Sequence, residues 1–193
     1  DQDYSAFINL LNEARQRYPI SLFSYCLMPN HFHLLVRAEK GQELSRCMQW
    51  LMTSHVRRYH RHYGGSGHVW QGRYKSFIVQ QDSYLVTAAR YIEANPLRAG
   101  LVDLLQDWPW SSYAESCGAK GRAITTPLPV SFDLNWSEFA VQPLLPRARE
   151  KWQQSMERQA PFGGDAWRES VCKLFGLQAT LRPKGRPKKE PKK

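Results

Sequence analysis

The chain has 193 residues, enough for one hydrophobic core and a small appendage. Hydrophobic residues make up 42% of it, and no apolar run approaches the ~20 residues that a membrane-spanning helix needs. The chain carries 27 Lys and Arg against 17 Asp and Glu, and this formal net charge of +10 favours an acidic partner such as nucleic acid.

Hydrophobic periodicity predicts the elements of the first half. An apolar stripe over 3–18 is typical of a helix, and the β-branched and aromatic residues of 20–27 indicate a strand. A turn at 28–30 makes 31–37 the returning strand of a hairpin. A second stripe predicts a long helix over 43–63.

A glycine-rich break at 64–67 ends this helix. Residues 75–80 have the composition of a further strand, and Asp82 or Ser83 can cap a helix that runs towards Asn95. The order helix, strand, strand, helix, strand, helix is that of a ferredoxin-like split βαβ sheet whose first strand is missing from the chain. We therefore expect an α+β fold with a helical or irregular C-terminal extension.

The second half of the chain contains fewer regular elements. Residues 108–113 indicate a loop packed on the domain, and the proline-punctuated stretch 127–146 indicates irregular structure. Helices are expected over 147–159 and 165–175. The predicted domains are 1–115, an extension with short helices over 116–178, and a basic, mobile tail over 179–193.

The positive charge is concentrated in two segments. Residues 181–193 hold seven Lys and Arg and one Glu, a net charge of +6. Residues 44–81 contain no Asp or Glu but four His and five Trp and Tyr, which suits a phosphate backbone with unpaired bases. A solvated helix face with aromatic side chains in the core is the alternative. The expected DNA contacts in this segment are Arg46, Arg57, Arg58, Arg61, Trp70, Gln71, Arg73 and Lys75.

Two histidines form the first candidate for chemistry. On a strand, His31 and His33 project from the same face, so both imidazoles can converge on one metal ion. Two ligands leave the coordination sphere incomplete, and the same spacing also arises by chance on surface strands. Imidazole favours zinc or a later transition metal, whereas Mg²⁺ prefers oxygen.

A helical face supplies the second candidate. Tyr84 and Tyr91 are seven residues apart and Asn95 follows four later, which places all three on one side of the helix. Next to a metal that polarises a phosphate, a tyrosine hydroxyl can attack and become an ester. Asn95 could offer its amide oxygen as the missing ligand. Core tyrosines and an asparagine cap are the structural alternative.

Three separated motifs resemble the REP-associated tyrosine transposases, a bacterial branch of the single-tyrosine HUH transposases. The first runs from Tyr25 to Val36 and contains His31-Phe32-His33. The others are Val69-Trp70-Gln71-Gly72-Arg73-Tyr74-Lys75-Ser76 and the stretch from Tyr91 to Val102 with its Asn95-Pro96 pair. The match spans roughly residues 4–113, which makes the predicted domain 1–115 an HUH catalytic domain.

The resemblance implies a metal-dependent endonuclease and strand transferase that cleaves single-stranded DNA beside hairpins such as REP elements. It implies Mg²⁺ or Mn²⁺ held by His31, His33 and, from its position, Asn95. Tyr91 matches the nucleophile, and the product would be a 5′-phosphotyrosine with a free 3′-hydroxyl. Members usually carry an N-terminal strand before the first helix, and this chain lacks it.

Other properties follow as expectations. The chain begins at Asp1 without an initiator methionine or a leader, so we expect a fragment rather than an exported precursor. The chain has four cysteines without a C-x-x-C motif: Cys26, Cys47, Cys117 and Cys172. Their even number allows disulfides, but we favour a location in a reducing bacterial cytoplasm, at the nucleoid. We expect no membrane or small-molecule partner, and we favour a monomer over the alternative of a dimer that exchanges its catalytic helix.

The tail contains Lys184-Gly185-Arg186-Pro187, which resembles the core of an AT-hook. Lys184 and Arg186 could enter a narrow minor groove, or the tail could add affinity that does not depend on sequence. Two further alternatives apply to the whole protein. It could be a non-catalytic hairpin-binding regulator that keeps the fold, or a phosphodiesterase that activates water, with Tyr91 structural.

Overall fold

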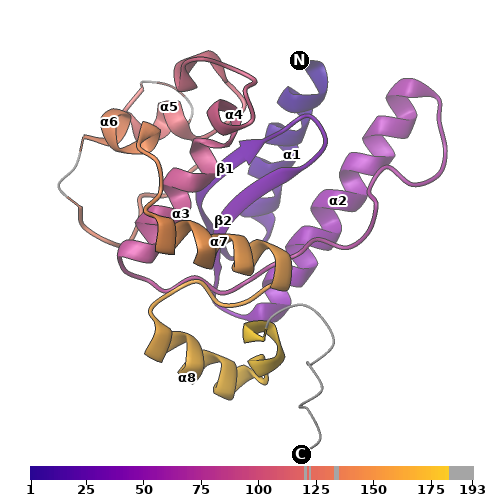
Figure 1. Cartoon of the computed structure of the whole chain (residues 1–193). Coiled ribbons are helices and arrows are strands. Elements are labelled where there is room, and N and C mark those ends of the chain that lie inside the picture. Colours follow the sequence, from indigo (N-terminus) through magenta and orange to yellow (C-terminus); the bar gives the residue numbers. More distant parts are fainter. Residues whose placement is uncertain (120, 122, 133–134, 183–193) are drawn as a thin grey trace, which may run out of the picture. The chain divides into compact units, whose positions relative to one another are not determined.

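The computed structural model describes residues 1–119, 121, 123–132 and 135–182 (Figure 1). The chain divides into two compact units, of which the first comprises 1–74 and 81–143. The second comprises 75–80 and the described residues from 144 onward. The domain boundaries expected after residues 115 and 178 stay predictions. No helix in the described part of the chain is long and apolar enough to cross a membrane.

An antiparallel strand pair supports the site in the first unit. β1 (Ile20–Leu27) pairs with β2 (Phe32–Ala38), which confirms the predicted hairpin. The register shifts between Leu22 and Ser24, so Phe23 forms a β-bulge. Leu22 packs in the main core, whereas Ser24 hydrogen-bonds on the opposite face of the sheet.

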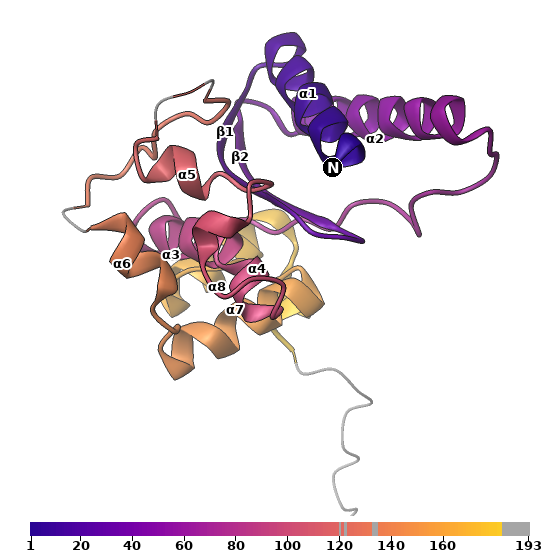
Figure 2. The same ribbon diagram turned by 90° about the horizontal axis from the view of Figure 1, so that it is seen from above.

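Helices cover both faces of this sheet (Figure 2). α1 (Gln2–Arg17) and α2 (Gly41–Tyr63) pack on one face, and α3 (Ser83–Glu93) packs against both strands on the other. All three helices were predicted from the sequence. The main core lies on the α1 and α2 side, where buried apolar side chains from the helices and β1 meet: Phe7, Leu11, Leu22, Tyr25, Leu27, Met48 and Leu51.

Short elements follow α3 in the first unit: α4 (Asn95–Arg98), η1 (Leu105–Asp107), α5 (Tyr113–Ser116) and α6 (Trp136–Val141). The helix α6 lies within 127–146, which the sequence predicted to be irregular, so that prediction is wrong over six residues. Its cap explains the helix, because the Asn135 side chain accepts a hydrogen bond from the Ser137 N–H.

Described residues between 110 and 126, here called the edge strap, run along the outer edge of β1. The backbone N–H of Leu27 donates to the Trp110 carbonyl at 2.8 Å, and the Ser112 N–H donates to the Tyr25 carbonyl at 2.9 Å. Further along, the Thr126 N–H donates to the carbonyl of β1 residue 22 at 2.6 Å. The predicted loop over 108–113 is therefore confirmed as packed on the domain.

The second unit contains α7 (Pro146–Arg158), α8 (Asp165–Phe175) and η2 (Gln178–Leu181), and its two long helices were predicted. Residues 75–80 belong to it and not to the sheet, so the predicted third strand is wrong. Their extended backbone instead pairs with Phe162, which accepts from Gln80 N–H at 2.9 Å and donates to the Ile78 carbonyl at 2.8 Å. The α+β class is confirmed.

Candidate active site

Of the two candidate histidines, His33 is the second residue of β2 and His31 immediately precedes the strand. His33 pairs with Cys26 of β1, on the sheet face that α3 covers, while Phe32 packs towards the core on the other face. The imidazole rings of His31 and His33 are 4.9 Å apart and nearly perpendicular. The alternation of a strand therefore brings the two rings together, as the sequence predicted.

Both imidazoles are held in the neutral form. Burial lowers the pKa of His31, and it lowers that of His33 to about 4, with the charges of His31 and Arg98 acting in the same direction. The Nδ1 atom of His31 lies 2.7 Å from the acceptor Asn30 Oδ1, so Nδ1 carries the proton and Nε2 keeps its lone pair. A neutral, oriented imidazole is the form that ligates a metal.

The helix α3 carries Tyr91 on the same side of the sheet. It begins at Ser83, and the Asp82 side chain caps it by accepting from Tyr84 N–H at 2.8 Å. Tyr91 is half-buried near the C-terminal end, and Asn95 opens the next short helix. Pro96 ends the regular backbone pattern of α3, as expected for a residue that lacks an N–H.

Arg98 links these groups, and the sequence prediction missed it. Its guanidinium lies 3.6 Å from the centroid of the Tyr91 ring, and its Nη2 donates to the Tyr91 carbonyl and, at 3.1 Å, to Asn95 Oδ1. Burial lowers the pKa of Arg98, while its attraction to Tyr91 raises it. Arg98 is also near enough to His33 to lower the pKa of that imidazole. The available sequence signal was that Arg98 follows Asn95 by three residues and Tyr91 by seven, a spacing that places side chains on one face of a helix.

Glu93 is a second residue that sequence reasoning passed over. Its side chain is fully buried, and burial raises its pKa against the opposing effect of its hydrogen bonds. Oε2 accepts from the Trp136 indole at 2.7 Å, and the donors to Oε1 are three serine hydroxyls. They are Ser24 at 3.3 Å, Ser112 at 2.5 Å and Ser116 at 2.7 Å. Glu93 thereby fixes the Tyr91 helix to β1, α5 and α6.

The site offers some, but not all, of the ligands that a divalent metal ion needs. Within the described ranges, no group of three or more His, Cys, Asp or Glu could hold an ion. The two neutral imidazoles fit as ligands, and the Asn95 carbonyl oxygen has a second lone pair besides the one that Arg98 engages. The buried Nδ2 of Asn95 has no hydrogen-bond partner in the described structure. An ion held by His31, His33 and Asn95 would leave open coordination positions.

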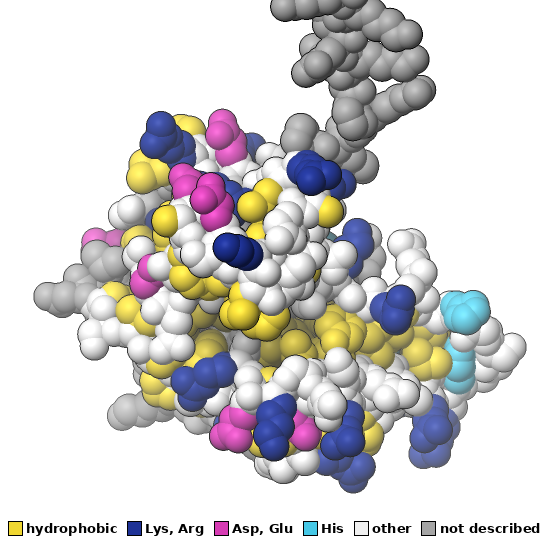
Figure 3. Space-filling model, turned by 90° about the horizontal axis from the view of Figure 1, so that it is seen from below, with side chains coloured by type: hydrophobic (Ala, Val, Ile, Leu, Met, Phe, Trp, Pro, Cys, Tyr) yellow, Lys and Arg dark blue, Asp and Glu magenta, His cyan; other side chains and the backbone are white. Residues whose placement is uncertain are grey.

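The expected DNA contacts are mostly exposed. Figure 3 shows Lys, Arg and His side chains around α2, towards the right of the view. Arg46 forms an ion pair with Glu43 at 3.6 Å, and Arg58 forms one with Asp3 at 3.1 Å, so these two charges already have partners. Lys184 and Arg186 lie outside the described residues. Exposed members of the set are Arg46, Arg57, Arg61, Gln71, Arg73 and Lys75.

Trp70, expected to stack on bases, packs on the protein. Its ring contacts Phe32 at 5.4 Å and His55 at 5.0 Å between centroids, and it borders the main core. The role of each predicted DNA contact stays a prediction.

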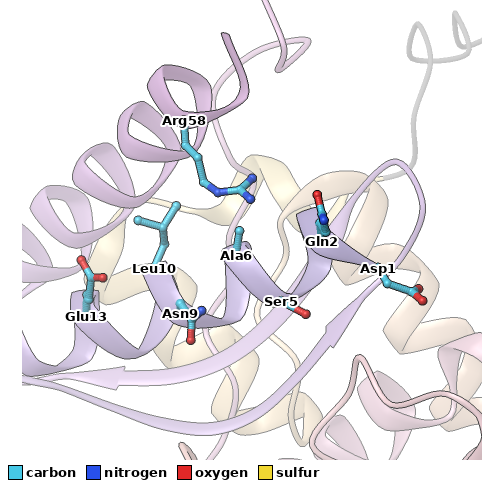
Figure 4. A pocket seen from close by; sticks show the side chains of 8 residues that line it. All are labelled: Asp1, Gln2, Ser5, Ala6, Asn9, Leu10, Glu13 and Arg58. Atoms are coloured by element: carbon cyan, nitrogen blue, oxygen red, sulfur yellow. The ribbon is translucent and has the colours of Figure 1, made fainter. Parts of the chain in front are cut away.

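A hollow of about 500 Å³ lies between α1 and α2 (Figure 4). It is lined by Asp1, by α1 side chains between Gln2 and Glu13, and by Arg58 of α2. It shares no residue with the histidine and tyrosine site, so the candidate chemistry lies elsewhere.

Comparison with known families identifies the domain that carries this geometry. Residues 1–95 match the family described as "Transposase IS200 like". The matched residues resemble this family and make up just under half of the chain. The IS200-like region contains the histidine pair, Tyr91 and Asn95, and Arg98 lies three residues beyond its end.

A relative of this chain is found in Haemophilus influenzae. It is named "Putative REP-associated tyrosine transposase" and is 28% identical over 131 residues, which cover 58% of this chain and 74% of the relative. No solved structure matches the chain.

Proposed function

We propose that the protein is a metal-dependent single-strand DNA endonuclease and strand transferase that acts beside hairpins such as REP elements. The observation that supports this most is the grouping of Tyr91, Asn95 and Arg98 with two neutral histidines in an IS200-like region. The relative named as REP-associated supports the hairpin as the substrate class. We also propose that one chain suffices and that it acts on DNA in a bacterial cytoplasm.

Tyr91 is the proposed nucleophile. Its phenolic oxygen forms a bond to phosphorus and loses its proton to solvent, while the bond to the 3′ oxygen breaks and that oxygen takes up a proton. The products are a 5′-phosphotyrosine and a free 3′-hydroxyl. Because the number of phosphoester bonds is unchanged, a later attack by a 3′-hydroxyl can rejoin strands without ATP.

The residues around Tyr91 have separate roles. His31, His33 and Asn95 would hold Mg²⁺ or Mn²⁺, which when bound supplies a Lewis acid for the scissile phosphate. The low pKa of His33 keeps its imidazole available as a ligand at neutral pH. Glu93, through its buried hydrogen bonds, fixes the helix from which Tyr91 projects.

A covalent-adduct experiment tests this function. Single-stranded hairpins with randomised flanks and a 3′ label are incubated with the protein and Mn²⁺ or Mg²⁺, then separated under denaturing conditions. The label should migrate with the protein, since the downstream fragment stays attached through its 5′ end. Tyr91→Phe, His31→Ala and EDTA should each abolish the adduct, whereas the matched control Tyr84→Phe should retain it.

Two outcomes would contradict the proposal. Cleavage without an adduct in the wild-type protein would favour a water-activating phosphodiesterase. Hairpin binding without cleavage under any metal would favour a regulator that keeps the fold.

A further inference from the structure

The turn that follows the Tyr91 helix has a defined geometry. Pro96 lies in the first turn of α4, and the Ala99 N–H donates to the Asn95 carbonyl at 2.9 Å. The chain then reverses at Gly100, whose φ of +66° lies in the left-handed region that favours glycine. The Leu101 N–H closes the reversal by donating to the Pro96 carbonyl at 3.0 Å.

This turn directs Arg98 back onto α3. The guanidinium stacks on the Tyr91 ring with 3.6 Å between its central carbon and the ring centroid. The same side chain donates to the Tyr91 carbonyl, in the last turn of α3, where carbonyls lack partners within the helix. A third contact, to Asn95 Oδ1 at 3.1 Å, orients the amide. One side chain thus restrains both the ring and the main chain of Tyr91.

We propose that Arg98 is a positioning residue for the Tyr91 nucleophile. A tyrosine ring on a half-exposed helix end can rotate about two side-chain bonds, and only some of these orientations bring its oxygen in line with a phosphate. A planar cation stacked on one ring face selects one orientation before DNA binds. This inference rests on the proposed function, in which Tyr91 attacks.

The decisive experiment separates the rate of attack from DNA affinity. Adduct formation is followed in single turnovers at saturating hairpin DNA for Arg98→Ala and Arg98→Lys. Binding is measured with the same substitutions in a Tyr91→Phe background. We expect Arg98→Ala to slow adduct formation about 10- to 100-fold while affinity changes less than about threefold. Arg98→Lys, which keeps the charge but not the planar stacking group, should lie between.

Arg37 supplies a matched control. Its guanidinium also lies over an aromatic ring, at 5.5 Å from the centroid of Phe23, but it has no place in the proposed site. Arg37→Ala should therefore leave the adduct rate within about twofold of wild type, because a substitution that shares no partner with the Tyr91 site should act independently of it.

Two readouts distinguish positioning from a general effect on folding. The ring carbon of Tyr91, labelled with ¹³C and assigned by its loss in Tyr91→Phe, should shift in Arg98→Ala but not in Arg37→Ala. Millimolar guanidinium should partly restore the adduct rate of Arg98→Ala. Should that variant unfold, Arg98→Lys carries the same comparison of rate with affinity.

Arg98→Ala with a wild-type adduct rate, or with a rate that falls only in proportion to affinity, would overturn the inference. If Tyr91→Phe still formed the adduct, the proposed function itself would fail, and the two failures are therefore distinguishable.

Discussion

Glu93 lies two residues beyond Tyr91, and its carboxylate is completely enclosed. Its four hydrogen-bond donors come from β1, the edge strap with its short helix α5, and α6, so one side chain joins segments that lie up to 69 residues from it in the chain. A buried carboxylate is stable only where donors replace water, and here three hydroxyls and an indole do so. The orientation of the proposed nucleophile helix therefore depends on a residue that need not touch DNA.

Replacing Glu93 tests this role. Glu93→Leu leaves the buried Trp136 indole without its acceptor and removes the carboxylate oxygen that three serine hydroxyls share, so the free energy of unfolding should fall by at least about 3 kcal/mol. Glu93→Gln keeps one acceptor for the indole, and the hydroxyls can rotate towards its amide, so it should lose about half as much or less. Urea denaturation measures both. Equal losses in the two variants would contradict this account.

For single residues, the sequence predicted those whose spacing matches the repeat of a strand or a helix. His31 and His33 alternate on a strand, and Tyr91 and Asn95 recur on a helix, so their placement was predictable. Glu93 was not, because its role depends on Trp136, 43 residues later in the chain. Arg98 had a local signal, but only the turn ending at Gly100 shows that its side chain folds back.

At the scale of elements, residues 75–80 show that a local pattern can predict backbone conformation without predicting the pairing partner. Their composition indicated an extended backbone, and extended backbone is present. The partner was wrong, because Phe162 and not a neighbouring strand of the sheet supplies the hydrogen bonds. The bulge at Phe23 is a similar case, since strict alternation would place Leu22 and Ser24 on one face.

The close packing of Gly163 against Gln80 allows a test of how residues 75–80 are held. A Cβ atom there would lie 2.4 Å from Trp167 and 2.6 Å from the side-chain oxygen of Gln80, which also accepts from the Gly164 N–H at 2.8 Å. Gly163→Ala should therefore destabilise the second unit by about 1–3 kcal/mol through overpacking. Gly72→Ala is the control, because its added methyl would meet nothing within 4 Å. Thermal unfolding compares the two, and equal melting temperatures would contradict the tight approach.

At the scale of the molecule, charge should govern DNA affinity. If about six phosphates are neutralised on a single strand, the logarithm of affinity should fall with the logarithm of salt concentration at a slope of about −4. Fluorescence anisotropy of a labelled hairpin oligonucleotide between 50 and 300 mM salt, roughly the range over which such slopes are resolved, measures it. A slope shallower than about −1 would contradict a basic groove.

Paired substitutions in the tail decide between its two interpretations. Lys184→Ala with Arg186→Ala removes the residues that resemble an AT-hook, and Lys188→Ala with Lys189→Ala removes the same charge beside them. A tail that adds only general affinity predicts equal changes in slope, about 1.4 for two phosphate contacts. A minor-groove contact predicts a larger loss for the first pair on hairpins with an A·T-rich stem.

The edge strap also bears on how the protein behaves at high concentration. An open strand edge is a template on which other chains can add strands, and this is a common route to aggregation. The hydrogen bonds from Leu27, Ser112 and Thr126 occupy that edge of β1 within the chain itself. A proteolytic cut that releases the strap would therefore leave backbone N–H and C=O groups of β1 unpaired, and other chains could add strands to that edge.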